Sequence, residues 1–140
     1  MIGAKVLVAE DEAIIAMEIK LSLQEQGYTV LEPTATIADT LASLSRDRPD
    51  VALLDMQLLD GFAMPIAATL AAMGVPFALL LADRLDALRE ASLADVPCIM
   101  KPWSPGDIEQ MVEQLLASSA AGLSQTLPAA AASSRATAPA

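Results

Sequence analysis

Carboxylate side chains follow two apolar runs of the sequence. Glu10 and Asp11 come directly after residues 6–9, and Asp55 comes directly after residues 51–54. If these runs are neighbouring parallel strands, their carboxyl ends lie at one edge of a sheet and the three carboxylates converge there. Converging carboxylates repel one another unless a cation offsets their charge, and ligands that are all oxygen suit Mg²⁺. The pattern therefore predicts a metal site.

One lysine is placed to join these carboxylates. Lys101 follows the apolar run 98–100, whereas Lys5 and Lys20, the other two lysines, do not end such a run. Beside a metal ion and an ammonium group, Asp55 can act as a nucleophile toward a phosphoryl group. The two cations would neutralise the phosphoryl oxygens during transfer. These residues predict aspartyl-phosphate chemistry.

Short apolar runs that could form the strands recur at near-regular spacing. They do not alternate polar and apolar residues, which is typical of parallel strands covered on both faces. The five runs are residues 6–9, 28–31, 51–54, 77–81 and 98–100.

The first two segments between these runs have helical patterns. Apolar residues recur at 15, 19 and 23, and Gly27 is placed to end that helix. Thr36 and Asp39 have the spacing of a capping box at the start of a second helix.

The later segments continue the alternation. Pro65 is placed in the first turn of a third helix that ends near Gly74. The fourth crossover, residues 84–95, leaves room for only a short helix, and Ser104 is the expected N-cap of the fifth. Five strand–helix units with right-handed crossovers predict an α/β fold with a doubly wound sheet, (βα)5.

Composition excludes several other classes of function. The net charge is −10, which disfavours nucleic acid as a ligand and is compatible with binding a hard cation. There is no histidine, and Cys98 is the one cysteine, so no Ser-His-Asp or Cys-His triad and no histidine-based zinc site can be built. The lack of a disulfide framework and of a signal-peptide pattern indicates a cytoplasmic protein.

Two segments differ from an ordinary globular pattern. Residues 62–82 carry no charge and are long enough to span a bilayer, but a Gly-Val-Pro break at 74–76 favours a buried helix, a turn and a strand, with no membrane insertion. Residues 118–140 are rich in Ala and Ser and cannot supply a core. We expect a domain over residues 1–117 and a disordered tail over 118–140.

In order and spacing, the segments VLVAEDE, PDVALLD and IMKPW resemble the receiver domain of two-component response regulators. The resemblance covers residue 4 to about residue 117. It implies a flavodoxin-like, five-stranded parallel sheet in the order 2-1-3-4-5. It also implies that Asp55 is the phosphoacceptor, that Glu10 and Asp11 are the family's acidic pair, and that Lys101 and Pro102 are its Lys-Pro pair, usually joined by a cis peptide bond.

The same resemblance implies a cofactor and a partner. Mg²⁺ or Mn²⁺ would be bound by Asp11, Asp55 and the backbone carbonyl of Gln57, with Glu10 acting mainly through water. The phosphoryl group would come from a sensor histidine kinase.

Three features depart from the family pattern. Leu81 occupies the position where receivers usually have Thr or Ser, and Cys98 the position where they usually have Tyr or Phe. Those two residues form the usual switch, so we expect an atypical one. After Asp55 the chain has Leu-Leu-Asp-Gly at residues 58–61 instead of the usual Met-Pro-x-x-Asp-Gly loop.

Several of these residues also have purely structural interpretations. Glu12 is expected to cap or solvate the first helix, Cys98 to pack in the core, and Trp103 to pack beside the site. Asp55 could be a turn residue, and Lys101 a solvated surface lysine.

The functional hypothesis is a stand-alone receiver, because too little chain follows residue 117 for an output domain. It would signal through a protein partner on its fourth helix, fifth strand and fifth helix, or act as a phosphate sink. The alternative is a pseudo-receiver that is never phosphorylated and acts as an interaction module, which Leu81 favours. An aspartate-nucleophile phosphatase would need a carboxylate at Gln57, and a flavin or nucleotide carrier would need a glycine-rich turn after the first strand.

Overall fold

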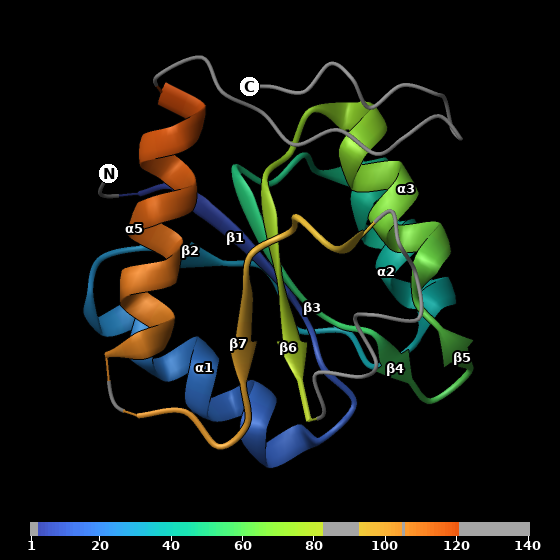
Figure 1. Cartoon of the computed structure of the whole chain (residues 1–140), viewed down its shortest axis with the longest axis horizontal. Helices are drawn as coiled ribbons and strands as arrows, with labels where there is room; N and C mark the ends of the chain where they lie inside the picture. The colour runs from blue at the N-terminus through green and yellow to red at the C-terminus, as the bar shows by residue number, and fades with distance from the viewer. Residues whose placement is uncertain (1–2, 83–92, 105, 121–140) are drawn as a thin grey trace.

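The computed structural model describes residues 3–82, 93–104 and 106–120 of the chain. A five-stranded sheet forms the middle layer and helices cover both of its faces (Figure 1). The predicted fourth helix falls almost entirely outside the described residues, and the predicted tail does so beyond Ala120.

The main sheet is entirely parallel. Its strands are β1 (Lys5–Ala9), β2 (Thr29–Val30), β3 (Val51–Asp55), β6 (Phe77–Leu81) and β7 (Cys98–Met100), in the order β2-β1-β3-β6-β7. Counted along the chain, this is the predicted order 2-1-3-4-5, which is confirmed. The strands β1 and β3 are direct neighbours, with Val8 paired to Leu53.

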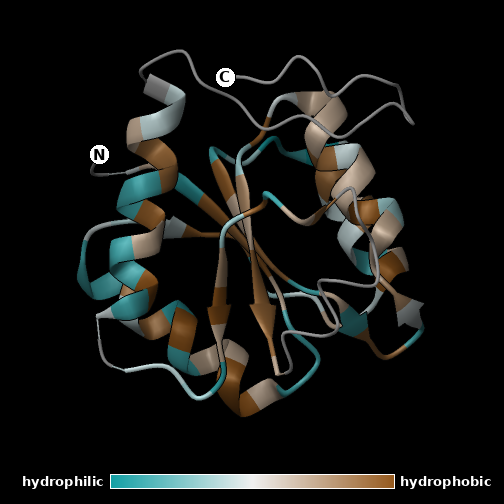
Figure 2. Ribbon diagram, viewed as in Figure 1, coloured by the Kyte–Doolittle hydropathy of each residue, from teal (hydrophilic) through white to brown (hydrophobic). Residues whose placement is uncertain are grey.

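Alternation along the strands divides the core into two clusters, one on each face of the sheet. Leu7 and Leu54 face the side covered by α2 (Ile37–Arg46) and α3 (Met64–Met73). Val8 and Leu53 face the side covered by α1 (Ala13–Glu25) and α5 (Asp107–Ala120). Because both faces are covered, every residue of β3 is buried, and the strands are the most hydrophobic part of the fold (Figure 2).

The helix boundaries follow the predicted signals in most places. The hydroxyl of Thr36 accepts a hydrogen bond from the Asp39 amide at 3.0 Å, which caps α2. Pro65 lies in the first turn of α3, and Gly74 ends this helix in the left-handed conformation, with φ of 74°. The helix α5 begins at Asp107, two residues later than the predicted start at residue 105, and it continues to Ala120.

A small hairpin that the sequence analysis did not predict lies outside the main sheet. Its strands are β4 (Gln57–Leu58) and β5 (Gly61–Phe62), paired antiparallel directly after β3 (Figure 1). The uncharged segment 62–82 folds into the end of this hairpin, α3 and β6. Among the described residues, no helix is long and apolar enough to cross a membrane.

Candidate functional site

The predicted site residues lie together at the carboxyl-end edge of the sheet. Glu10 and Asp11 follow the last residue of β1, Asp55 is the last residue of β3, and Lys101 follows the last residue of β7. Since β1 and β3 are adjacent, the three carboxylates converge. Glu10, Asp11 and Asp55 each offer one oxygen within 4.8 Å of those of the other two.

Lys101 joins two of these carboxylates. Its Nζ donates a hydrogen bond to Oδ2 of Asp55 at 3.1 Å and lies 3.1 Å from Oε1 of Glu10. A longer hydrogen bond, of 3.4 Å, reaches Oε2 of Glu10. The peptide bond between Lys101 and Pro102 is cis, as the resemblance implied.

Burial and neighbouring charges set the pKa values of Glu10 and Lys101. Glu10 is only 2% exposed, and Asp55 is 8% exposed. Burial, and secondarily the charge of Asp55, raises the pKa of Glu10 to about 7, although the Glu12 amide and Lys101 oppose the shift. Burial alone would lower the pKa of Lys101, but Asp55 and Glu10 outweigh it, so the pKa rises above its usual value. Lys101 therefore stays positively charged at neutral pH.

The charge balance of the site fits a divalent cation. Three carboxylates face one ammonium group, and the buried Oε1 of Glu10 has no hydrogen bond although it forms an ion pair with Lys101 at 3.1 Å. One ammonium group does not balance three converging carboxylates, and the remaining negative charge is costly unless a cation or a proton offsets it. The available ligands are all oxygen, which is the set that Mg²⁺ prefers.

Gln57 is brought to the site by its backbone. Its amide donates a hydrogen bond of 2.9 Å to Oδ1 of Asp55, so both carboxylate oxygens of Asp55 have a donor. The side chain of Gln57 is exposed. The structure therefore shows a direct contact of the Gln57 peptide unit with Asp55.

At Leu81 and Cys98, where we expect an atypical switch, the structure has an aliphatic side chain and a thiol. Leu81 ends β6 and is 2% exposed, while Cys98 begins β7 and packs half-buried against the core. The Lys101 amide donates to the Leu81 carbonyl at 2.7 Å, which ties the ends of the two strands together.

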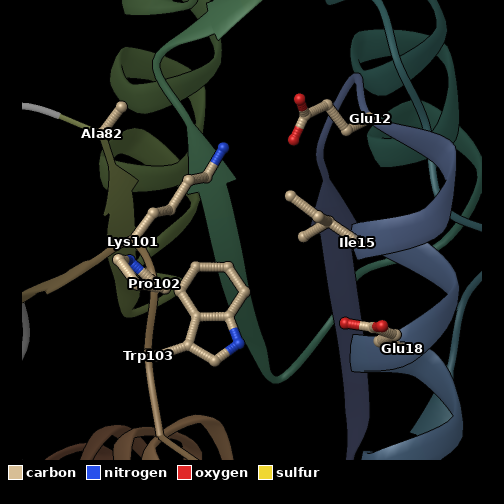
Figure 3. Close-up of a pocket in the computed structure, with 7 residues that line it drawn as sticks. All are labelled: Glu12, Ile15, Glu18, Ala82, Lys101, Pro102 and Trp103. Carbon is tan, nitrogen blue, oxygen red and sulfur yellow. The ribbon is translucent and has the colours of Figure 1, made fainter.

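A cavity of about 410 Å³ opens beside Lys101. Lys101 and Trp103 project toward α1, whose start and first turns supply Glu12, Ile15 and Glu18 to the opposite wall (Figure 3). Trp103 thus packs beside the site, as predicted. Glu12 occupies the N-cap position of α1 without a side-chain capping bond.

The hairpin β4–β5 is the part of the site that sequence reasoning missed. Its loop residue Asp60 accepts hydrogen bonds from the Ile37 and Ala38 amides, at 2.6 and 3.2 Å. The available signal was the Asp-Gly pair at residues 60 and 61, because both residue types are frequent in tight turns, with Gly favoured at the last position of a type I turn.

Known proteins are similar to this chain in both sequence and fold. The chain is 32% identical over 114 residues to the sensory transduction protein LytT of Bacillus cereus, covering 79% of this chain and 45% of that protein. It is 29% identical to SdrG of Sphingomonas melonis Fr1, with a TM-score of 0.71 and coverage of 81% and 97%. A CheY-like receiver domain protein of Methanospirillum hungatei superposes with a TM-score of 0.77 at 21% identity, covering 86% and 98%.

The chain spans about half the length of the curated relatives that it matches. Residues 6–113, which include the whole carboxylate and lysine group, match the model of the response regulator receiver domain. The chain therefore belongs to the receiver domain family of two-component signalling, whose members are phosphoacceptor modules rather than true enzymes.

Proposed function

We propose that this receiver domain accepts a phosphoryl group on Asp55 from a histidine kinase in the cytoplasm, in a reaction that depends on Mg²⁺ or Mn²⁺. The observation that carries the proposal is the contact between Lys101 and Asp55 beside the oxygens of Glu10 and Asp11. A buried carboxylate whose charge is balanced by an ammonium group is a nucleophile held in one orientation.

The chain's own residues suit an in-line transfer. One oxygen of Asp55 forms the new bond to phosphorus, the bond from phosphorus to the donor nitrogen breaks, and the leaving imidazole keeps that electron pair. Lys101, held positive at neutral pH, neutralises charge on the phosphoryl oxygens. A bound Mg²⁺ supplies Lewis-acid stabilisation of the same oxygens.

The metal ligands that we propose are Asp11, Asp55 and the backbone carbonyl of Gln57, with Glu10 acting through water. Asp11 is half-buried at the mouth of the site, whereas Glu10 lies deeper and is paired with Lys101. This difference in depth supports a direct role for Asp11 and an indirect one for Glu10.

Protein partners would use two surfaces. Three large apolar side chains of α1 are exposed, Ile14, Met17 and Leu21, at 75%, 47% and 52%. They recur at helical spacing on a helix that begins two residues after Asp11, which supports docking of the phosphodonor protein there. The output partner would bind the face formed by β7, α5 and the segment before β7.

A second candidate function is a pseudo-receiver that acts without phosphorylation. The observation that favours it is Leu81, a buried aliphatic side chain at the end of β6. Such a domain would retain the fold and its docking surfaces but would not form an aspartyl phosphate.

Intact-mass measurement after incubation with Mg²⁺ and a small acyl-phosphate donor separates these candidates. We expect a single phosphoryl adduct that is absent from Asp55→Asn. An adduct that persists in Asp55→Asn would contradict the choice of Asp55, and the absence of any adduct on the wild-type protein would favour the pseudo-receiver.

A further inference from the structure

The hairpin β4–β5 controls where the Gln57 backbone lies. It begins two residues after Asp55, and its two strands are joined by only Leu59 and Asp60. A hairpin with two residues in each strand is not stable by itself in water. Its position must therefore be set by contacts with the rest of the fold.

The pairing within the hairpin leaves the Gln57 carbonyl available. Gln57 is opposite Phe62, and the flanking Ala63 amide donates to the Met56 carbonyl at 2.8 Å. In an antiparallel pair, hydrogen-bonded and non-hydrogen-bonded positions alternate, so Gln57 and Phe62 occupy a non-hydrogen-bonded position. The backbone groups of Gln57 consequently point away from β5, and its amide is indeed bonded to Asp55.

The N-terminus of α2 holds the other end of the hairpin. The carboxylate of Asp60 accepts hydrogen bonds from Ile37 and Ala38, the first two residues of α2. The Leu59 amide donates to the Ala35 carbonyl at 3.1 Å. Free amides and the helix dipole at an N-terminus favour a negative charge there.

These contacts connect the start of α2 to a backbone carbonyl beside the phosphoacceptor. We propose that Asp60 is a positioning residue, which fixes the Gln57 carbonyl in the metal site by anchoring the hairpin β4–β5 to the N-terminus of α2. The inference rests on the proposed function, because it takes the Gln57 carbonyl to be a metal ligand. It goes beyond that function because it names Asp60, three positions after Gln57, as the residue that fixes where the Gln57 carbonyl lies.

The chain offers matched variants for a test. Asp60→Ala and Thr36→Ala each remove a side-chain acceptor from the N-terminus of α2, but only Asp60 lies in the hairpin. Asp60→Asn removes the charge while keeping one acceptor oxygen. Mg²⁺ affinity is measured by calorimetric titration, and hydrogen exchange of the Gln57 and Leu59 amides is measured in the metal-free protein.

We expect Asp60→Ala to weaken Mg²⁺ binding about tenfold, as loss of a partner that orients a ligand does, and to speed exchange of the Leu59 amide. Asp60→Asn should bind with intermediate affinity, since the remaining oxygen still holds one amide. Thr36→Ala should bind Mg²⁺ like the wild-type protein, even though its unfolding temperature falls.

If Asp60→Ala and Thr36→Ala weaken Mg²⁺ binding equally, the inference is overturned, because the cause would then be a general loosening of α2. If Asp60→Ala and Asp60→Asn weaken Mg²⁺ binding equally, the inference is also overturned, since the loss of negative charge alone would explain the weaker binding. A wild-type protein that binds no Mg²⁺ would overturn the metal assignment itself, and the metal-free exchange data would still show whether Asp60 holds the hairpin.

Discussion

Nζ of Lys101 lies 3.1 Å from Oδ2 of Asp55, although the two residues are 46 positions apart in the sequence. The parallel sheet produces this contact, because β3 and β7 end at the same edge with only β6 between them. Lys101 stays charged there, since the carboxylates outweigh the effect of burial on its pKa. If Asp55 accepts a phosphoryl group, as we propose, an ammonium group held against it would stabilise negative charge as that group arrives.

The first prediction removes that ammonium group. Lys101→Met should slow phosphorylation of Asp55 by a small acyl-phosphate donor by about a hundredfold, because one preorganised cation in a transition state has this order of effect. The initial rate is followed by intact mass at saturating Mg²⁺. Lys5→Met is the matched control, as Lys5 pairs with Asp47 at the start of β1 and should leave the rate unchanged. Equal rates in Lys101→Met and the wild type would remove Lys101 from the chemistry.

The second prediction concerns the metal. Asp11→Asn should weaken Mg²⁺ binding by more than about tenfold, because Mg²⁺ is held by few protein oxygens and loses a charged one. Calorimetric titration gives the affinity directly. Glu18→Gln removes a carboxylate that lines the neighbouring cavity and should bind Mg²⁺ as the wild type does. If both variants weaken binding equally, the effect is one of net charge and Asp11 is not a ligand.

The third prediction is a dependence of stability on pH. The pKa of Glu10 in the folded protein is about 7, above its usual 4.5, so between these values the folded state binds more protons than the unfolded state. The contribution of Glu10 to the free energy of unfolding of the metal-free protein should therefore fall as the pH rises from 4.5 to about 7. Glu10→Gln lacks the titrating group and should gain stability relative to the wild type as pH rises.

Urea unfolding of both proteins at about pH 5 and about pH 7.5, with a chelator present, measures this difference. The remaining carboxylates act alike in the two proteins and cancel in the comparison. Stability curves that stay parallel across the window would mean that Glu10 does not titrate there.

Much of this arrangement could be predicted from the sequence, for a physical reason. Unbroken apolar runs identified parallel strands, and parallel strands carry the residues at their carboxyl ends to one edge. That reasoning brought Glu10, Asp11, Asp55 and Lys101 together without any contact being known. The order of the strands depended on the resemblance to receivers, since crossover handedness alone leaves more than one order.

Three features were not predicted from the sequence, because they depend on tertiary contacts that local sequence patterns do not indicate. The hairpin β4–β5 is too short to have a periodic signal, and it is held by amides of α2 from more than 20 positions earlier. The helix α5 begins at Asp107 and not directly after Ser104, although the Asp107 carboxylate accepts a hydrogen bond from the Ser104 amide at 2.8 Å, as in one half of a capping box. The depth of Glu10, the most buried of the three carboxylates, likewise reflects packing rather than sequence spacing.

The fourth prediction concerns Leu81, where we expect an atypical switch. Leucine has no hydroxyl to donate to a phosphoryl oxygen, and a hydrogen bond to a charged group is worth about 1.5–3 kcal/mol, or roughly a ten- to hundredfold bias. A modification shifts a conformational equilibrium only by its differential free energy between the two states. Phosphorylation should therefore produce small NMR shift changes at Leu81, Ala82 and residues 93–103, with larger ones confined to Asp11, Asp55 and Lys101.

A variant that restores the hydroxyl makes this prediction sharper. Leu81→Thr should be less stable, because a buried leucine is replaced by a smaller and more polar residue. Once phosphorylated, however, it should show larger shift changes at the ends of β6 and β7, since a hydrogen bond from the introduced hydroxyl to the phosphoryl group distinguishes the two states. The ends of these strands are already joined by the bond from the Lys101 amide to the Leu81 carbonyl, so movement at one should reach the other. A large, concerted shift across residues 93–103 in the phosphorylated wild type would show that another contact has replaced the missing switch.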